Sequence, residues 1–174
     1  EDDVNEPGRG YLWDAVERAG VTLRNYGEFT YRKPDGTWTA TKSFLAAHTC
    51  PDFPGYDLDI PDQKRADAWL REFRGYERTQ SLPALTFLWL PNDHTSGGKS
   101  RAPTPRAHVA DNDLALGRVI EALSHSSFWK DTVVFVVEDD AQDGPDHVDS
   151  HRSLLLVISA YIRPGVYHRF VNTT

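Results

Sequence analysis

The chain has 174 residues, a formal net charge of −7 and one cysteine. Its length suffices for one domain with a sizeable core, while the acidic charge excludes a general nucleic-acid binder, which needs clustered Lys and Arg. A single cysteine excludes an internal disulfide. Cys50 and the nearby His48 supply only two ligands, too few for a zinc site, so a buried thiol is expected. No apolar stretch approaches the ~20 residues that span a bilayer, so no transmembrane segment is expected.

The first half of the chain alternates helix and strand signals. Apolar residues recur at helical spacing in residues 11–19 and 62–78, and residues 21–29 have the pattern of a strand. Between them, aromatic residues on either side of a Pro-Asp-Gly turn predict a hairpin, followed by a loop rich in Pro, Gly and Asp. We therefore expect residues 30–60 to form an excursion from a single, partial domain that spans residues 1–174.

The second half continues the alternation. Strand patterns occupy residues 84–90, 132–137 and 154–159. A helix is predicted over residues 109–123, with its start near residues 107–111, after the basic, Pro-rich residues 99–105. Helices that alternate with apolar strands favour an α/β fold, in which helices cover a layered sheet of mostly parallel central strands.

The densest group of charged residues follows one of these strands. Residues 138–151 contain six carboxylates and two imidazoles, directly after the apolar run 132–137, which we predict to be a strand buried on both faces. Like charges at this density repel unless a cation or a proton neutralises them. Because ligands of open α/β sheets gather outside the carboxyl ends of strands, Asp139 and Asp140 are expected at a divalent-metal site.

Several ordered motifs carry a resemblance to a known family. Residues 123–148 combine a serine-then-tryptophan helix end, a buried strand, an acidic pair and an Asp-His-Val triplet seven residues after Asp139. This order resembles the bacterial phosphoesterase family that contains non-haemolytic phospholipase C and metal-dependent acid phosphatases, within the alkaline phosphatase superfamily. Residues 11–26 look like the family's helix and strand that follow its nucleophile. Residues 91–97 and 111–113 look like the subgroup that is sometimes fused to a β-propeller.

The resemblance implies a fold and an activity. The fold is alkaline-phosphatase-like, and the activity is metal-dependent hydrolysis of a phosphate mono- or diester by a Ser or Thr nucleophile that lies outside this chain, before residues 1–10. We therefore expect a hydrolase in the intact protein and no turnover by the chain alone. The implied partner is a small phosphate ester or a lipid head group, and the implied location is periplasmic or secreted. The alternative function is a non-catalytic binding or structural module that holds one metal or none.

The resemblance also assigns site residues, around two divalent metal ions. Asp139 and Asp140 match the ligands of the metal that activates the nucleophile. Asp93 and His94 look like the acid and imidazole of the other metal, and His151 looks like its closing histidine. Such mixtures of oxygen and nitrogen ligands suit Zn²⁺, Mn²⁺, Mg²⁺ or Ca²⁺. The catalytic contact to the phosphate is assigned to His147.

Ordinary structural roles remain open for several of these side chains. Asp93 fits an Asx turn or a helix cap, and His94 fits a hydrogen bond within the loop. The superfamily commonly separates this acid and histidine by three residues, whereas Asp93 and His94 are adjacent, so an alternative is that one of them supports a ligand and does not bind the metal itself. His147 fits a loop anchor equally well. His108 is expected on the surface, and Asp111 is expected to favour the start of its own helix through the helix dipole.

The two ends of the sequence indicate a partial domain, and this predicts self-association or low stability. The sequence contains no methionine, and residues 170–174 carry no helix-stop signal, which we interpret as a piece of a longer protein, incomplete at both ends. An incomplete sheet leaves a strand edge and apolar faces unpaired, and such surfaces tend to find another copy. A homo-oligomer or a low stability is therefore expected.

Overall fold

The computed structural model describes residues 7–138 and 153–168, and the chain divides into two compact units, Glu1–Ala122 and Leu123–Thr174. The elements, in chain order, are α1 (Leu12–Arg18), β1 (Leu23–Tyr26), β2 (Thr30–Arg32), β3 (Trp38–Ala40), α2 (Ser43–His48), α3 (Asp62–Thr79), β4 (Leu85–Leu88), the 3₁₀ helix η2 (Pro91–His94), α4 (Pro105–Ser124), the 3₁₀ helix η3 (Ser127–Asp131), β5 (Val133–Val137) and β6 (Leu155–Ser159).

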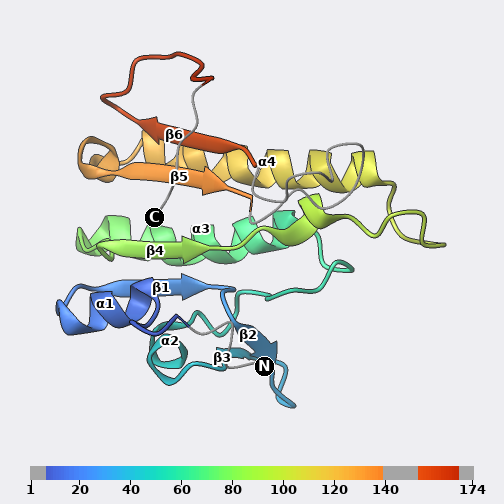
Figure 1. Cartoon of the computed structure of the whole chain (residues 1–174), viewed down its shortest axis with the longest axis horizontal. Coiled ribbons are helices and arrows are strands. Elements are labelled where there is room, and N and C mark those ends of the chain that lie inside the picture. The colour runs from blue at the N-terminus through green and yellow to red at the C-terminus, as the bar shows by residue number, and fades with distance from the viewer. Residues whose placement is uncertain (1–6, 139–152, 169–174) are drawn as a thin grey trace. The chain divides into compact units, whose positions relative to one another are not determined.

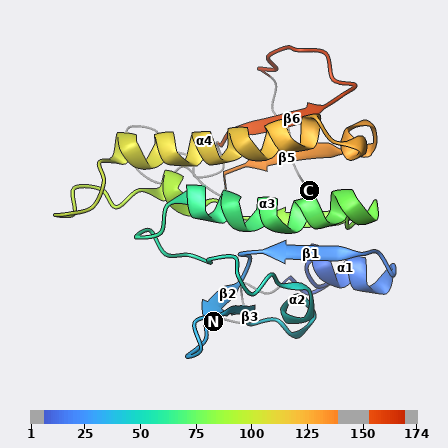
Figure 2. The same ribbon diagram turned by 180° about the vertical axis from the view of Figure 1, so that it is seen from behind.

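The first unit is built on a parallel pair of strands, β1 and β4. Leu23 lies opposite Leu85, and Tyr26 lies opposite Leu88. Figures 1 and 2 show the two strands side by side, with α3 along one face of the pair. Because successive side chains of a strand point to opposite faces, Arg24 and Tyr26 of β1 point toward α3, where both donate hydrogen bonds to Glu72. Leu23 and Asn25 point to the opposite face. The parallel connection from β1 to β4 confirms an α/β fold.

The face of the pair away from α3 carries the aromatic core. Trp13 and Val16 of α1, Leu23 of β1 and Leu45 of α2 are buried together, and Phe87 of β4 packs against them. The ring of Trp13 meets the ring of Phe87 edge to face, with centroids 6.0 Å apart. Helix α2 did not figure in the sequence prediction, since six residues are too few to show helical periodicity.

Strands β2 and β3 form the hairpin that the Pro-Asp-Gly turn predicted. They pair antiparallel, and the turn is closed by a hydrogen bond in which the Lys33 amide donates to the Thr37 carbonyl oxygen, at 2.8 Å. The Asp35 carboxylate accepts from the amide and the hydroxyl of Thr37. The following loop packs back on this hairpin at Gly55, where a Cβ atom would meet the Thr30 hydroxyl and come within 2.8 Å of the Trp38 ring.

We expect Gly55→Ala to destabilise the chain, because both neighbours would have to shift. The expected loss is about 1–3 kcal/mol in the free energy of unfolding, measured by urea denaturation. Gly75→Ala is the matched control: a Cβ there meets nothing closer than the end of the Arg78 side chain, at 3.8 Å. Since Gly75 lies within helix α3, this second change is expected to stabilise by about 0.5–1 kcal/mol. Equal effects of the two changes would contradict the close approach at Gly55.

The second unit contains the antiparallel pair β5–β6. Val133 lies opposite Ser159, and Val137 lies opposite Leu155. Alternate side chains of β5 are exposed, Phe135 by 62%, so the prediction of a strand buried on both faces is wrong in this structure. The physical reason is that β-branched and aromatic residues favour any strand, and an antiparallel pair tolerates one open face.

Candidate functional site

The candidate site lies just beyond the carboxyl end of β4. The chain leaves the strand through Trp89 and Leu90 and turns at once into η2, which contains Asp93 and His94. Proline at the first position of η2 suits a helical start, because its ring fixes φ and its missing N–H is not needed there. The structure therefore places two of the six site residues of the sequence prediction next to each other on one turn. The other four lie outside the described residues: Asp139, Asp140, His147 and His151.

Four buried or half-buried polar side chains hold this turn from behind. We call them the Asp62–Asp111 network; its members are Asp62 of α3, Asn92 of η2, and Asp111 and Asn112 of α4. The Asn92 amide donates to Asp62 Oδ2 at 3.0 Å, and its side-chain Nδ2 donates to Asp111 Oδ2 at 2.8 Å. Nδ2 of Asn112 donates to Asp62 Oδ2 at 3.0 Å and to the Leu90 carbonyl oxygen at 2.7 Å. The network joins two helices to the turn that carries Asp93 and His94.

The network also begins helix α3. Asp111 Oδ2 accepts a second hydrogen bond, at 2.6 Å, from the backbone amide of Asp62, one of the amides that a helix start leaves without a partner in the helix. The sequence prediction that Asp111 favours the start of its own helix is wrong, because α4 begins at Pro105 and has no acidic residue in its first turn. The Asp111 carboxylate caps α3 instead. Asn92 Oδ1 is buried without a hydrogen-bond partner in the part of the chain that the structure describes.

Arg65 neutralises the buried carboxylate at the centre of the network. Asp62 and Arg65 are both 0% exposed, and Arg65 Nη1 lies 2.9 Å from Asp62 Oδ1. Burial raises the pKa of Asp62, although the Asn92 amide, Arg65 and Asn112 all favour its charged form. The remaining donors of Arg65 reach four carbonyl oxygens of the preceding loop, those of Pro54, Gly55, Asp57 and Ile60. One guanidinium thus holds both the loop and the network.

Tyr56, from the loop that Arg65 holds, brings an aromatic ring to His94. The ring of Tyr56 stacks on Trp89 at a centroid distance of 5.6 Å and meets the His94 ring edge to face at 5.5 Å. Nδ1 of His94 lies 3.1 Å from the carbonyl oxygen of Thr95. Because a carbonyl oxygen only accepts, this contact assigns the proton of the neutral ring to Nδ1 and the lone pair to Nε2. Metal-binding histidines commonly have this arrangement, with the second nitrogen bonded to a carbonyl.

Strain in the backbone coincides with this turn. Thr95 has φ 59° and ψ 168°, a conformation that a β-branched residue rarely adopts. Its hydroxyl accepts from the Gly97 amide at 3.2 Å, and its own amide donates to the Asn92 carbonyl oxygen at 3.1 Å. Such strain costs on the order of 1–3 kcal/mol and is found preferentially at functional sites.

The donor atoms of the turn fit a divalent metal in type. Asp93 supplies a half-buried carboxylate and His94 an exposed imidazole, the ligands that Zn²⁺ and Mn²⁺ accept. No group of three or more His, Cys, Asp or Glu side chains that could hold a metal occurs among residues 7–138 and 153–168. A complete metal site would therefore have to draw on ligands outside these ranges.

His108 is buried, so the prediction that it lies on the surface is wrong. His108 is only 2% exposed, whereas the adjacent Val109 is 48% exposed. Neither ring nitrogen of His108 has a hydrogen-bond partner among the described residues. The buried face of α4 runs through His108, Ala115, Val119 and Leu123. These residues are spaced by seven, four and four positions, the repeat of one helix face, so the spacing from His108 to Ala115 was the signal that could have placed His108 in the core.

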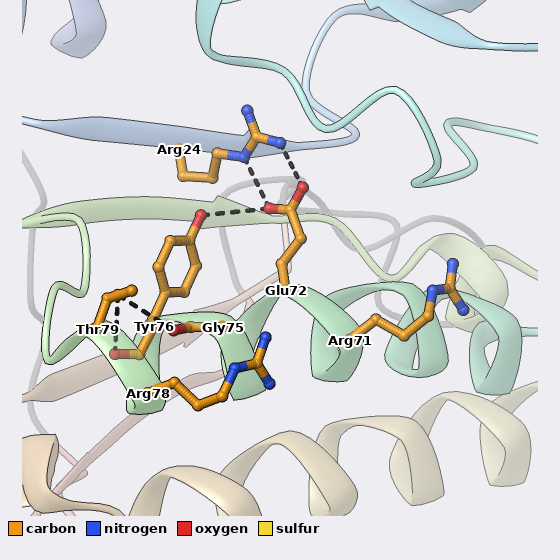
Figure 3. Close-up of a pocket in the computed structure, with 7 residues that line it drawn as sticks. All are labelled: Arg24, Arg71, Glu72, Gly75, Tyr76, Arg78 and Thr79. Carbon is orange, nitrogen blue, oxygen red and sulfur yellow. Dashed lines mark hydrogen bonds and ion pairs between the residues drawn. The ribbon is translucent and has the colours of Figure 1, made fainter.

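A hollow of about 510 Å³ lies toward the other end of α3 (Figure 3). Its lining contains Arg24 of β1 and six residues of α3: Arg71, Glu72, Gly75, Tyr76, Arg78 and Thr79. At the centre, Glu72 accepts from Arg24 Nε at 2.9 Å, from the Tyr26 hydroxyl at 2.7 Å and from the Tyr76 hydroxyl at 3.2 Å. Since α3 begins at the Asp62–Asp111 network, the helical rise from Asp62 to Glu72 places this hollow roughly 15 Å along the helix from the network.

The groups around this hollow are unsuited to proton transfer. Burial raises the pKa of the Cys50 thiol to about 11, and burial together with its hydrogen bonds raises that of the Tyr26 hydroxyl. Burial alone would raise the pKa of Glu72, but hydrogen bonds from Arg24, Tyr26 and Cys50 lower it to about 2. Acids and bases of enzymes have pKa values near the working pH, so we assign this cluster a structural role. Cys50 is 1% exposed, which confirms the predicted buried thiol.

Comparison with known proteins bears on the fold. The structure resembles that of a protein in the alkaline phosphatase superfamily from Vibrio parahaemolyticus, with a TM-score of 0.57 and 18% sequence identity. The chain has an alkaline-phosphatase-like α/β fold. The match covers 87% of this chain and 41% of that chain, so this chain spans about two fifths of the neighbour's length. No family model matches the sequence, and no curated protein matches it significantly.

The described helices also bear on membrane association. None of the helices in residues 7–138 and 153–168 is long and apolar enough to cross a membrane.

Proposed function

We propose that this chain is part of a metal-dependent phosphoesterase, which hydrolyses a phosphate mono- or diester. The observation that carries the proposal is the turn η2: it places a carboxylate and an imidazole with its lone pair on Nε2 at the carboxyl end of a parallel strand. Ligands of open α/β sheets bind at that edge. The alkaline-phosphatase-like fold supports the same reading, and the subgroup of phospholipase C and acid phosphatases is our proposal from the sequence motifs.

The proposed roles follow the ligand types. Asp93 and His94 would hold one divalent ion together with His151, and Asp139 and Asp140 would hold the second. A bound divalent ion would supply Lewis-acid stabilisation of the phosphoryl and leaving oxygens. His147 would donate a hydrogen bond to a phosphate oxygen. The Ser or Thr nucleophile would come from sequence outside this chain, so turnover is proposed for a longer protein that contains it.

The residues described by the structure already restrict how His94 can act. The Thr95 carbonyl oxygen fixes the ring tautomer, and the edge contact with Tyr56 limits rotation of the ring. Tyr56 is itself held by stacking on Trp89. His94 is thereby oriented as a ligand without a conformational search at the moment of binding.

We expect the chain to bind Mn²⁺ or Zn²⁺, because the proposed ligands Asp139, Asp140 and His151 would add to the donors of η2. Titration calorimetry should detect heat on addition of either ion, and Asp139→Ala should remove it. Asp113→Ala is the control: this acid is exposed on α4, one residue from the Asp62–Asp111 network, and its loss should leave the affinity unchanged. Absence of heat with both ions, in protein shown to be folded, would contradict the proposal.

The same experiment separates the proposal from the alternative of a non-catalytic module. A longer protein with a Ser or Thr after an acid-tipped strand should hydrolyse a chromogenic phosphomonoester or diester when metal is added, and the 174-residue chain should not. Metal binding without turnover by the longer protein would favour the binding module.

A further inference from the structure

We propose that the Asp62–Asp111 network positions Asp93 and His94 as metal ligands. This inference rests on the proposed function, because it assigns a task to residues that lie behind the proposed ligands. The network members contact the backbone and side chain of Asn92, the residue immediately before Asp93. They would act through the turn and without contact to the metal or the substrate.

The geometry of the network restrains the turn at two consecutive points. Asn112 Nδ2 donates to the carbonyl oxygen of Leu90, where the chain enters η2. Asp62 and Asp111 then hold the amide and the side chain of Asn92. Because the restraints come from both α3 and α4, they fix the position of the turn as well as its local conformation.

The cost of this arrangement argues for a role beyond filling space. The network gathers two carboxylates, one of them 0% exposed, and needs the buried guanidinium of Arg65 as a counter-charge. It leaves Asn92 Oδ1 without a partner among the described residues, and it stands behind the strained backbone of Thr95. An apolar contact between α3 and α4 would join the helices without these penalties, but it would not bind the Leu90 carbonyl oxygen and the Asn92 amide.

A second ion pair between α3 and α4 provides a matched control. Arg118 of α4 lies 2.6 Å from Asp67 of α3 and also donates to Gln63. The ion pair links α3 to α4, as the Asp62–Asp111 network does, yet it makes no hydrogen bond to η2 among the described residues. Removal of Asp67 therefore tests the packing of the helices, and removal of Asp111 tests the packing together with the turn.

The experiment compares Mn²⁺ affinity and amide hydrogen exchange in three variants of the 174-residue chain. Asp111→Ala is expected to weaken Mn²⁺ binding about 10- to 100-fold, as is usual when residues behind metal ligands are lost. It should also speed exchange in residues 89–97. Asp111→Asn keeps an oxygen that can accept from both donors and should restore the affinity to within about threefold. Asp67→Ala should change neither quantity.

Each outcome decides between the two proposals. If the parent chain binds Mn²⁺ and folded Asp111→Ala binds it equally well, the network does not position the ligands, while the proposed function stands. If the folded parent chain binds neither Mn²⁺ nor Zn²⁺, the proposed function fails and the inference with it. Should Asp111→Ala not fold, Asn112→Ala tests the same idea, because it removes only the donor to Leu90 and Asp62 and is expected to weaken binding about tenfold.

Discussion

Arg65→Met is expected to cause the largest loss of stability of any single change considered for this chain. The substitution leaves the carboxylate of Asp62 buried with no counter-charge, and it leaves four loop carbonyl oxygens without their donor. Breaking a buried ion pair by removing one partner costs about 3–5 kcal/mol. Because domains are stable by only about 5–15 kcal/mol, we expect a chain that is largely unfolded or unfolds at much lower urea concentration.

The comparison with Arg118→Met tests the cause of that loss. Arg118 and Asp67 also form an ion pair, but their side chains are 32% and 42% exposed, against 0% for both Arg65 and Asp62. An exposed pair contributes about 0–1 kcal/mol, so Arg118→Met should shift the urea midpoint only slightly. Similar midpoints for the two variants would show that burial of the Asp62–Arg65 pair does not control its contribution.

Glu72→Gln is expected to remove a pH dependence of stability below about pH 5. Burial would raise the pKa of this carboxyl, but the donors Arg24, Tyr26 and Cys50 outweigh it and hold the pKa at about 2 in the folded chain, against 4.5 in the unfolded chain. A lowered folded-state pKa means that the folded chain gains stability above pH 4.5. It loses that stability as the pH falls toward 2.

The expected size of this effect is about 2–3 kcal/mol, allowing for the 28% exposure of the side chain. Urea denaturation at several pH values should therefore show the parent chain more stable than Glu72→Gln at pH 7, with the difference shrinking between pH 4.5 and pH 2. Glu77→Gln is the control on the same helix, because its carboxylate makes no hydrogen bond in the part of the chain that the structure describes. A difference between parent and Glu72→Gln that is constant with pH would contradict the assignment of the low pKa.

The regular elements were largely predictable because their signals are local. Helix α3 was predicted to end at Arg78 and ends at Thr79. Helix α4 was predicted over residues 109–123 and spans Pro105–Ser124, so it begins earlier than predicted. In both helices the apolar residues recur at helical spacing, and this repeat is visible in a short stretch of sequence without knowledge of the fold. The position of Asp93 and His94 after a strand was predictable for the same reason, since an apolar run followed by polar residues marks the end of a strand.

Burial was harder to predict, because it depends on what covers a face. His108 was expected at the surface and is buried, while the adjacent Val109 is 48% exposed. A histidine is read from sequence as a surface residue, and only its surroundings in the folded chain decide that it is buried. Likewise, the uniform apolar run of β5 did not reveal how many of its faces are covered.

Sequence alone determined the alternation of helices and strands, the buried thiol of Cys50 and the turn that carries two proposed ligands. Only the tertiary structure decided that Asp62, Asn92 and Asp111 meet, because Asn92 and Asp111 lie 30 and 49 positions after Asp62 along the chain. Hydrogen bonds between residues so far apart in sequence leave no periodic pattern, since the sequence around each partner is that of an ordinary turn or helix. Their meeting depends on how α3 and α4 pack at the end of β4, which long-range contacts set and local propensity does not.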